Sequence, residues 1–473
     1  MLHRILQEVG LVALFHSPLD SKLLCAQRFV RLFAYGGSTL ILASYLSALD
    51  ISDDRIGLFM TLTLVGDVVI SFLLTLFADA LGRKAVLLLG SGMMCASGVV
   101  FGLCGNYWAL LAAAIFGVIS PNGNEIGPFR AVEESTIAHI TPKENMSDIF
   151  AWYSLIGTAG TALGMMVCGW LMSILQETQN WEFVAACRVV FLLYAAVGAV
   201  KFALTMGLSS NVEADSKNKK QQQQNGNNGP SETEPLLGSN NGQNQEQEQQ
   251  QDEVEIPNRR SIPFLPGVES QFIGLVTSLF LLFALDSFGS ALASLSWITY
   301  YFRRKFDMSD GELGSLFSGT SIIQAISMLL ASSIAKRFGN VKTMVFTHLP
   351  SSVFLALMPI PSSFPIAMIF LVGRACLQNM DVAPRSAFLA SALPAEQRTA
   401  IMGTINVVKT TSSSLAPVLT GILSSRGALW VSFLAAGCLK IGYDLGMLIT
   451  FGGMDKEQHK KQQAAVRDEE DQN

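Results

Sequence analysis

The stretch FPIAMIFLVGRACLQNMDVAPRSAFLASAL, residues 364–393, is apolar enough to cross a lipid bilayer, yet it carries four strongly polar side chains. These are Arg374, Gln378, Asp381 and Arg385, spaced i, i+4, i+7 and i+11, so a continuous helix would present all four on one narrow face. A charged side chain at the centre of a bilayer costs roughly 2.5–3.5 kcal/mol on insertion scales. We therefore expect this row to face a protein interior or a water-filled cavity.

The composition of the whole chain indicates a polytopic membrane protein. Half of the 473 residues are hydrophobic and only 15% are charged, whereas soluble domains carry about 25% charged residues. The seven cysteines show no CxxC spacing, so we expect packing residues and not disulfides or metal ligands. The sequence shows no nucleophile–base set, metal-ligand spacing or phosphate-binding loop. Neither an enzyme nor a metal, cofactor or nucleic-acid partner is predicted.

Windows of about 20 apolar residues predict six membrane spans in each half of the chain. The first six are 29–49, 56–78, 85–104, 107–140, 149–175 and 187–208. The second six are 270–296, 313–335, 343–360, 364–393, 401–423 and 428–451. The predicted organisation is a cytoplasmic segment 1–28, a bundle 29–208, a linker 209–268, a second bundle 269–452 and a cytoplasmic tail 453–473.

The linker is rich in Gln, Asn, Glu and Gly, a composition that cannot bury a core and predicts disorder. Within it, Glu232, Leu236 and Leu237 match the pattern E-x-x-x-L-L of acidic dileucine signals, which sorting adaptors bind; a chance match is the alternative. The pattern predicts a vacuolar or lysosome-like membrane, with the plasma membrane as alternative. Lys and Arg in short loops predict that both termini are cytoplasmic, although Arg303, Arg304 and Lys305 fall on the opposite side.

The two predicted bundles repeat each other. Residues 79–84, DALGRK, close the second span, and residues 333–342, SIAKRFGNVK, close the eighth with Gly339 at the place of Gly82. The fourth and tenth spans are both long and polar, and each is followed by a loop that contains proline. Parallel repeats of this kind place a binding site between the halves near the bilayer midplane.

Twelve spans in two halves resemble the major facilitator superfamily of secondary transporters, and the resemblance covers nearly the whole chain. Residues 79–84 are similar to the signature of that family between helices two and three, G-x-L-a-D-R-x-G-R-K, although Thr75 replaces the leading Gly and Ala80 the first Arg. The resemblance implies an all-α fold of two six-helix bundles. It also implies a latch that meets the other half in the outward-open state, formed by Asp79, Gly82, Arg83 and Lys84. A solvated basic turn is the alternative.

Two carboxylates within spans are candidates for a proton path. Asp67 in the second span and Asp286 in the seventh each begin a stripe of small polar residues at i, i+4 and i+8. Burial favours the protonated form of a carboxylate, which allows it to bind and release a proton near neutral pH. A hydrogen-bonded structural Asp is the alternative for both.

The fourth span covers 34 residues, too many for one straight crossing. Residues 121–124, PNGN, should break it near the midplane, where only a cavity or protein packing can satisfy the freed backbone groups. Glu125 follows the break and is the leading candidate for proton or substrate contact. Arg130 can pair with Glu133 or Glu134 at i+3 or i+4, and a purely structural ion network is the alternative.

In the tenth span, Arg374 could pair with a carboxylate of the other half or bind an anionic substrate. Asp381 is expected near the midplane with Gln378 on the same face, and Arg385, four residues further on, could lock Asp381 as a structural pair near the cytoplasmic gate.

Near the end of the chain, Lys409 accompanies a polar stripe in the eleventh span and is a further path candidate. Lys440 and Asp444, at i and i+4 in the twelfth span, are predicted to neutralise each other.

The sequence predicts a secondary active transporter that moves a small solute by alternating access and is coupled to protons. An uncoupled facilitator and a transporter-like nutrient sensor that signals through the linker are the alternatives. The predicted partners are a small-molecule solute, protons, the lipid bilayer and a sorting adaptor. The predicted path residues are Asp67, Glu125, Arg130, Asp286, Arg374, Gln378, Asp381 and Lys409. The predicted gating residues are Asp79, Gly82, Arg83, Lys84, Glu133 and Arg385.

Overall fold

The computed structural model describes residues 11–117, 119, 121, 128–142, 145–213, 273–393 and 398–453. Glu125 and the dileucine segment 232–237 lie outside these residues, so the predictions made for them stay predictions. The same holds for the side chain of Asp79.

The described residues form helices and no strand, in an order that follows all twelve predicted spans. The N-terminal half contains α2 (Leu11–His16), α3 (Leu19–Ala48), α4 (Asp53–Leu81), α5 (Arg83–Leu103), α6 (Tyr107–Gly117), α7 (Pro128–Ile140), α8 (Met146–Ser173), η2 (Ile174–Thr178), α9 (Phe183–Met206) and η3 (Ser210–Val212). The C-terminal half contains α11 (Ile273–Leu292), α12 (Leu295–Phe306), α13 (Asp310–Phe338), α14 (Asn340–Leu357), α15 (Phe364–Leu377), α16 (Val382–Ala392), α17 (Arg398–Ser425) and α18 (Leu429–Phe451). The predicted fourth, seventh and tenth spans each consist of two helices.

The tenth span is broken where the sequence predicted one continuous helix. The helix α15 ends at Leu377, residues 378–381 form turns, and α16 begins at Val382. Pro384 lies in the first turn of α16, where its missing N–H costs no helical hydrogen bond. The prediction that Arg374, Gln378, Asp381 and Arg385 share one helical face is therefore wrong.

The first and seventh spans extend well beyond their predicted bounds. The helix α3 begins at Leu19 instead of residue 29, directly after Pro18, so Arg28 lies inside the helix together with Arg31. The seventh span continues from α11 into α12, which places Arg303 and its two basic neighbours in the last turn of a helix and not in a loop. Basic residues are favourable there because they complement the negative end of the helix dipole.

The repeat between the halves extends to the backbone. Gly82 precedes α5 with φ 95°, and Gly339 precedes α14 with φ 91°. Such positive φ angles strain other residues, so glycine is needed at both turns. The equivalence of Gly82 and Gly339 is thereby confirmed.

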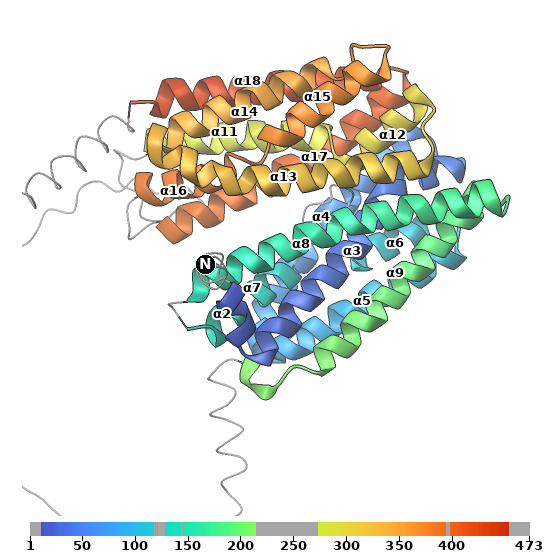
Figure 1. Ribbon diagram of the computed structural model, residues 1–473, viewed down its shortest axis with the longest axis horizontal. Helices are drawn as coiled ribbons and strands as arrows, with labels where there is room; N and C mark the ends of the chain where they lie inside the picture. Colours follow the sequence, from blue (N-terminus) through green and yellow to red (C-terminus); the bar gives the residue numbers. More distant parts are fainter. Residues whose placement is uncertain are drawn as a thin grey trace, which may run out of the picture.

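The two halves meet at one end and diverge at the other (Figure 1). Two helix crossings join them: Gly57 of α4 packs on Gly421 of α17, and Gly169 of α8 packs on Gly314 of α13. A Cβ at Gly57 would lie 2.5 Å from the carbonyl oxygen of Pro417, so only glycine permits this approach. We call the end with these crossings the closed end. The opposite end, which bears α7, α16 and the turn at Gly82, is the open end.

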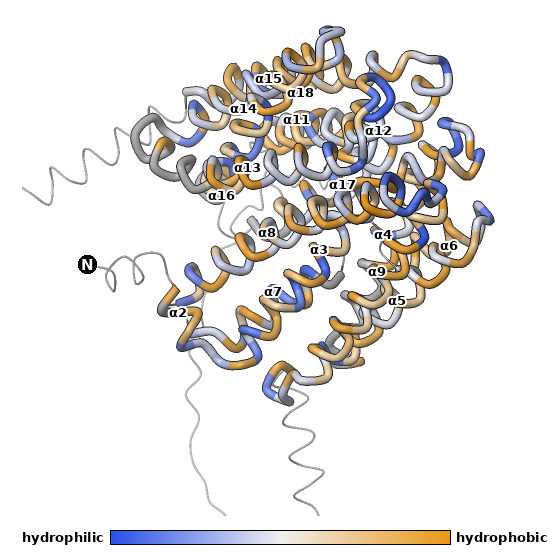
Figure 2. The backbone as a smooth tube through the Cα atoms, turned by 45° about the vertical axis from the view of Figure 1, so that its right-hand side comes forward, coloured by the Kyte–Doolittle hydropathy of each residue, from blue (hydrophilic) through white to orange (hydrophobic). Residues whose placement is uncertain are grey.

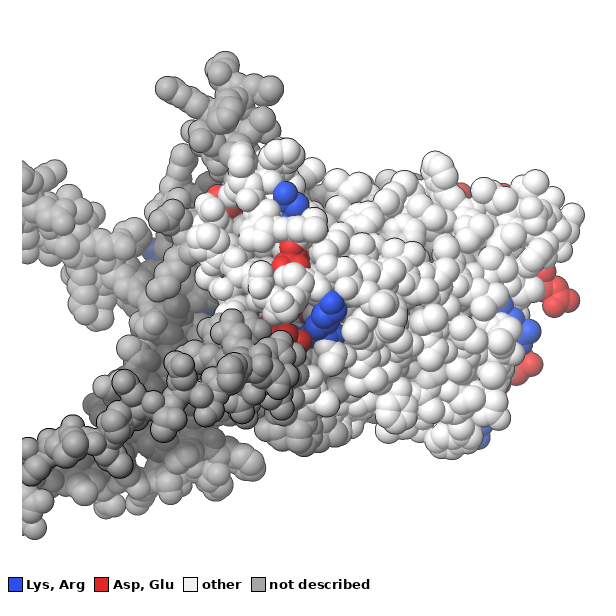
Figure 3. Space-filling model, turned by 90° about the horizontal axis from the view of Figure 1, so that it is seen from below, with Lys and Arg blue, Asp and Glu red and all other residues white. Residues whose placement is uncertain are grey.

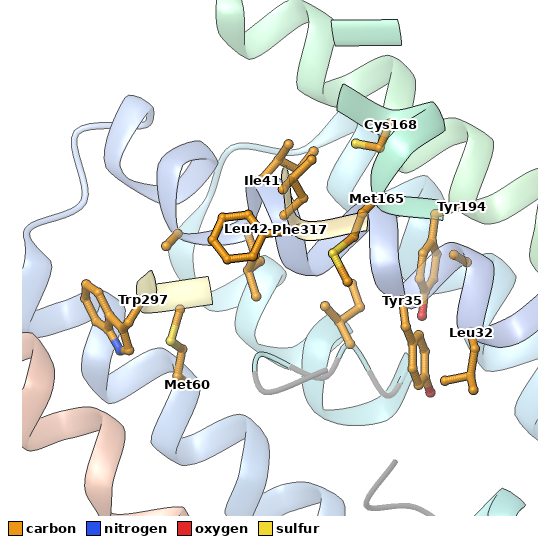
Figure 4. Packing of buried hydrophobic residues seen from close by; sticks show 14 of the residues in the cluster. Leu32, Tyr35, Ile41, Leu42, Met60, Met165, Cys168, Tyr194, Trp297 and Phe317 are labelled. Atoms are coloured by element: carbon orange, nitrogen blue, oxygen red, sulfur yellow. The ribbon is translucent and has the colours of Figure 1, made fainter. Parts of the chain in front are cut away.

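A single hydrophobic cluster connects the halves at the closed end. Figure 4 shows Met60 of α4 beside Trp297 of α12, with Ile41 and Leu42 of α3 near Phe317 of α13. A second cluster, which includes Phe283, Phe388 and Tyr443, belongs to the C-terminal half alone. Among the residues that the structure describes, apolar packing therefore joins the two halves at the closed end.

The surface fits a membrane environment. Six described helices are long and apolar enough to span a bilayer, and apolar residues colour most of the helical backbone in Figure 2. Figure 3 shows a broad surface without charged residues between charged groups near either end. The chain is an integral, multi-pass membrane protein.

Candidate functional site

A buried charge cluster lies inside the N-terminal half. Glu133 of α7 accepts hydrogen bonds from Arg31 of α3 at 2.6 Å and from the hydroxyl of Tyr153 of α8 at 2.5 Å. The ammonium of Lys201 of α9 lies 3.3 Å from the other carboxylate oxygen. Arg28 stacks over the Tyr153 ring at 4.0 Å. Four helices thus converge on one carboxylate, and we call this group the N-terminal cluster.

The N-terminal cluster is closed to solvent, because Glu133 is 0% exposed and Arg31 2%. A buried ion pair is stable only when further hydrogen bonds and charges compensate its desolvation, which Lys201 and Tyr153 provide here. Arg130 takes no part, since it pairs with Glu134 at 2.7 Å and its side chain is 48% exposed. The prediction that Arg130 pairs with Glu133 or Glu134 is confirmed, with Glu134 as the partner.

A second cluster occupies the C-terminal half. Asp286 of α11 accepts a hydrogen bond from Lys440 of α18 at 2.6 Å and one from Arg385 of α16 at 3.2 Å. His348 of α14 lies between this carboxylate and a second one: its Nε2 is 3.8 Å from Asp286, and its Nδ1 is 2.8 Å from Asp444 of α18. We call these five residues the C-terminal cluster.

The pairing inside the C-terminal cluster differs from the sequence-based prediction. Lys440 and Asp444 do not neutralise each other: Lys440 also donates to Ser290, and Asp444 accepts from Ser352 in addition to His348. Adjacent helices offer closer partners than the next turn of α18 does. The predicted pair of Asp381 and Arg385 is confirmed at 3.2 Å, so Arg385 bridges two carboxylates.

The remaining path candidates are dispersed. Lys409 of α17 lies over the ring of Phe283 at 5.7 Å, next to the C-terminal cluster, and Asp67 is buried within α4. Arg374 lies in the last turn of α15, on the face that also carries the buried Ala367 and Leu371. No side chain that the structure describes pairs with its guanidinium. Gln378, which follows, lies in the break between α15 and α16.

The turn at residues 82–84 binds its own half. The carboxylate of Glu213 accepts hydrogen bonds from the backbone N–H groups of Arg83 and Lys84, at the N-terminus of α5. The Lys84 ammonium donates to the carbonyl oxygens of Met206 and Leu208 at the end of α9. The predicted latch belongs to the opposite conformation, in which the halves would meet at this end, and it stays a prediction.

Two aspartates occupy equivalent positions at the closed end. Asp53, at the start of α4, accepts hydrogen bonds from Tyr300 at 2.8 Å and from Ser424 at 2.6 Å. Asp310, at the start of α13, accepts from Arg303 at 2.6 Å and from Gln176 at 2.7 Å. Each carboxylate therefore ties one half to the other at the end where they touch.

Several residues of the clusters were not among the predicted candidates, namely Arg28, Arg31, Tyr153, Lys201 and His348. None of them has a residue of opposite charge nearby in the sequence. For Arg31 and Lys201 the available signal was the charge itself, because a cation within a span needs a partner from another helix.

Solved structures of transporters share this architecture. The chain is similar to the nucleoside transporter NupG, with 14% identity, a TM-score of 0.64, and coverage of 92% of this chain and 99% of that one. A D-xylose-proton symporter gives 12% identity and a TM-score of 0.65, with coverage of 91% and 97%. A bacterial homologue of the human lysosomal transporter Spinster, in an inward-facing conformation, is 14% identical with a TM-score of 0.60. The match covers 91% of this chain and 94% of that one. At these identities the likeness shows the fold alone.

Sequence comparison places the chain within a family. The model of the Major Facilitator Superfamily matches residues 24–272 and 279–468. A protein of Saccharomyces cerevisiae, described as uncharacterized membrane protein YJR124C, is 35% identical over 448 residues, which cover 93% of this chain and 96% of the relative. The chain belongs to the Major Facilitator Superfamily, whose members are transporters and not enzymes.

Proposed function

We propose that this protein is a proton-coupled secondary active transporter, which carries a small solute between its two halves by alternating access. The observation that carries the proposal is the way the halves meet. They touch at the closed end through two equivalent glycine crossings and separate at the other, so a rocking motion could exchange the two ends.

The open end is proposed to face the cytoplasm. The short loops at this end hold most of the loop lysines and arginines of the sequence, as the positive-inside rule requires. Solved structures with the same fold include an inward open xylose transporter, at a TM-score of 0.61. The conformation described here is therefore proposed to be inward-open, with both termini cytoplasmic.

The solute is proposed to bind between the halves. On α17, Pro417 and Gly421 face α4 at the closed end, and Thr410 and Asn406 continue the same helical face toward the open end. Beyond the crossing, this polar face borders the space between the halves. Arg374 supports a charged contact with the solute, because a guanidinium at membrane depth is costly without a partner. Asp67, which is buried within a span, supports proton coupling. Asp286 is compensated by Lys440 and Arg385, and it supports coupling through its neighbour His348.

The experiment is a transport assay in proteoliposomes with an imposed pH gradient, using a solute first identified by ligand-induced thermal shift. A proton-coupled carrier accumulates the solute when the gradient is applied and not when an ionophore removes it. Equilibration without accumulation would instead indicate an uncoupled facilitator. An absence of any solute flux from a protein that binds the solute would contradict the transporter.

We further propose a vacuolar or lysosome-like membrane as the destination, on the basis of the dileucine pattern. Replacement of both Leu236 and Leu237 by alanine should redirect a fluorescently tagged chain to another membrane. An unchanged location in cells would contradict a sorting role for the pattern.

A further inference from the structure

The two buried clusters differ in one chemical property. The N-terminal cluster consists of a carboxylate, two arginines, a lysine and a tyrosine, none of which ordinarily changes its charge near neutral pH. The C-terminal cluster contains His348, and histidine is the side chain that ordinarily gains or loses a proton between about pH 5 and 8. The N-terminal cluster therefore carries fixed charges, while the C-terminal cluster contains a group able to exchange a proton.

His348 occupies a position where a proton has a direct structural effect. It is 3% exposed, and its two ring nitrogens face carboxylates from different helices, Asp444 of α18 and Asp286 of α11. When both nitrogens carry protons, the ring can donate to both carboxylates; when one does, only a single donor remains. Protonation therefore changes the attraction between α14 and its two neighbours.

A second proton on the His348 ring would supply the positive charge that the buried carboxylate of Asp444 otherwise lacks. Within the part of the chain that the structure describes, no lysine or arginine side chain lies within ion-pair distance of this carboxylate; its partners are His348 and Ser352. Asp444 is 1% exposed, and a buried carboxylate without a cation is strongly disfavoured. Asp286 differs, because Lys440 and Arg385 compensate it whatever the state of His348.

The titratable groups in contact with the His348 ring are Asp286 on α11 and Tyr443 and Asp444 on α18. Lys440 and Arg385 reach it through Asp286, Asp381 pairs with Arg385, and Lys409 lies over the Phe283 ring. The helix α15, which also packs on α14, carries Arg374. Arg385, whose side chain is 18% exposed, is the most accessible member of the C-terminal cluster and marks its side toward solvent.

The seventh span links this cluster to the closed end. Asp286 lies on α11, which continues after a short break at residues 293–294 into α12. From α12, Ser296 donates to the carbonyl oxygens of Thr39 and Pro121 in the other half, and Tyr300 donates to Asp53. A displacement of α11 at Asp286 would therefore act on the contacts that hold the two halves together.

We propose that His348, held between Asp444 and Asp286, is the proton-binding site that couples this carrier to pH, and that α11 and α12 transmit its protonation to the closed end. The inference rests on the proposed transport function and names its coupling site. The proton adds from water to the lone pair of the unprotonated ring nitrogen on one side of the membrane. It returns to water from the same nitrogen after the halves have exchanged their contacts.

The test needs no solute. Spin labels at positions 138 of α7 and 387 of α16, both exposed at the open end, report the separation of the halves in full-length protein with its seven cysteines replaced. In proteoliposomes, the labels report the ratio of the conformer with the open end separated to the conformer with that end closed. For the chain without further substitutions, this ratio should change by about tenfold between pH 5 and pH 8, which lies within the usual range of coupling between two sites. His348→Gln, which cannot be protonated, should abolish the shift. The matched control His16→Gln, an exposed histidine of α2, should retain it.

A second variant keeps the test decisive if His348→Gln does not fold. Asp444→Asn removes the charge that stabilises a protonated ring, so the pH midpoint of the shift should move to a more acidic value. A shift that persists unchanged in His348→Gln or Asp444→Asn would overturn the assignment while proton coupling stands. A pH-independent ratio in the unchanged protein would contradict proton coupling itself.

Discussion

The two halves repeat the same helices but bury different charge clusters. In the N-terminal cluster, Glu133 is compensated by Arg31 and Lys201, with the hydroxyl of Tyr153 as a further donor. In the C-terminal cluster, His348 is shared between two carboxylates, of which Asp444 has no lysine or arginine partner among the described residues. Two halves of one repeated fold therefore bury chemically different charge clusters, and the proposed proton site belongs to the C-terminal one.

The largest effect is expected when the N-terminal cluster loses its carboxylate. Glu133→Gln leaves Arg31 and Lys201 buried without an anion, which should lower the free energy of unfolding by about 3–5 kcal/mol. Denaturant unfolding in detergent measures this change. The neighbouring Glu134→Gln, which removes only a partly exposed pair with Arg130, should cost no more than about 1 kcal/mol. Equal costs for both variants would contradict a structural role specific to Glu133.

A smaller loss is expected from the equivalent change in the C-terminal half. In Asp286→Asn, Arg385 keeps its contact with Asp381 and Lys440 keeps Ser290. The cost should therefore lie near the lower end of the range for buried pairs, about 3 kcal/mol. The same unfolding experiment compares the two halves directly. If Asp286→Asn lowered the free energy of unfolding more than Glu133→Gln does, the proposal that the N-terminal cluster is the more rigid of the two would be contradicted.

The glycine crossings test whether the halves remain equivalent where they touch. Gly421→Val would overpack the contact with Gly57, which should destabilise the conformation described here by about 1–3 kcal/mol. The conformation in which the closed end has separated would not be affected, because the two helices no longer touch there. Spin-label distances across that end should show a roughly 5- to 150-fold shift in conformer ratio. Gly314→Val, at the equivalent crossing with Gly169, should give a similar shift.

The control for the crossings lies on the same helix as Gly421. A Cβ at Gly403 of α17 would meet no atom within 4 Å, so Gly403→Val should leave the conformer ratio unchanged. A shift in this variant would attribute the effect to the helix backbone and not to the crossing. A shift at one crossing alone would show that the halves move unequally.

The smallest effect is expected at an exposed ion pair of the closed end. Arg304 pairs with Asp53 at 3.2 Å, but its side chain is 62% exposed, so Arg304→Gln should change stability by no more than about 1 kcal/mol. Arg303→Gln should cost more, because Arg303 binds Asp310, whose side chain is 3% exposed. Thermal unfolding of both variants ranks the two ion pairs. A larger loss for Arg304 would contradict this ranking.

The membrane spans and their repeat could be predicted from the sequence because they depend on local properties. Apolar length defines a span, Pro121 indicated the break in the fourth span, and the glycines at 82 and 339 marked equivalent turns. The break after Leu377 was missed, because the apolar length of residues 364–393 indicated one continuous span. Of the ion pairs predicted within single spans of the C-terminal half, Asp381 pairs with Arg385, whereas Lys440 pairs with Asp286 and Asp444 with His348.

By itself, the sequence determined that the chain crosses the membrane many times, that its halves repeat, and that charges lie within the spans. Only the tertiary structure decided which charges meet. Glu133 and Arg31 are far apart in the chain, as are Asp286 and Lys440, and nothing in a linear pattern specifies such a pair. The physical reason is that a buried charge takes the partner that helix packing brings within reach. The row Arg374, Gln378, Asp381 and Arg385 was visible in the sequence, but its division between two helices came from the fold.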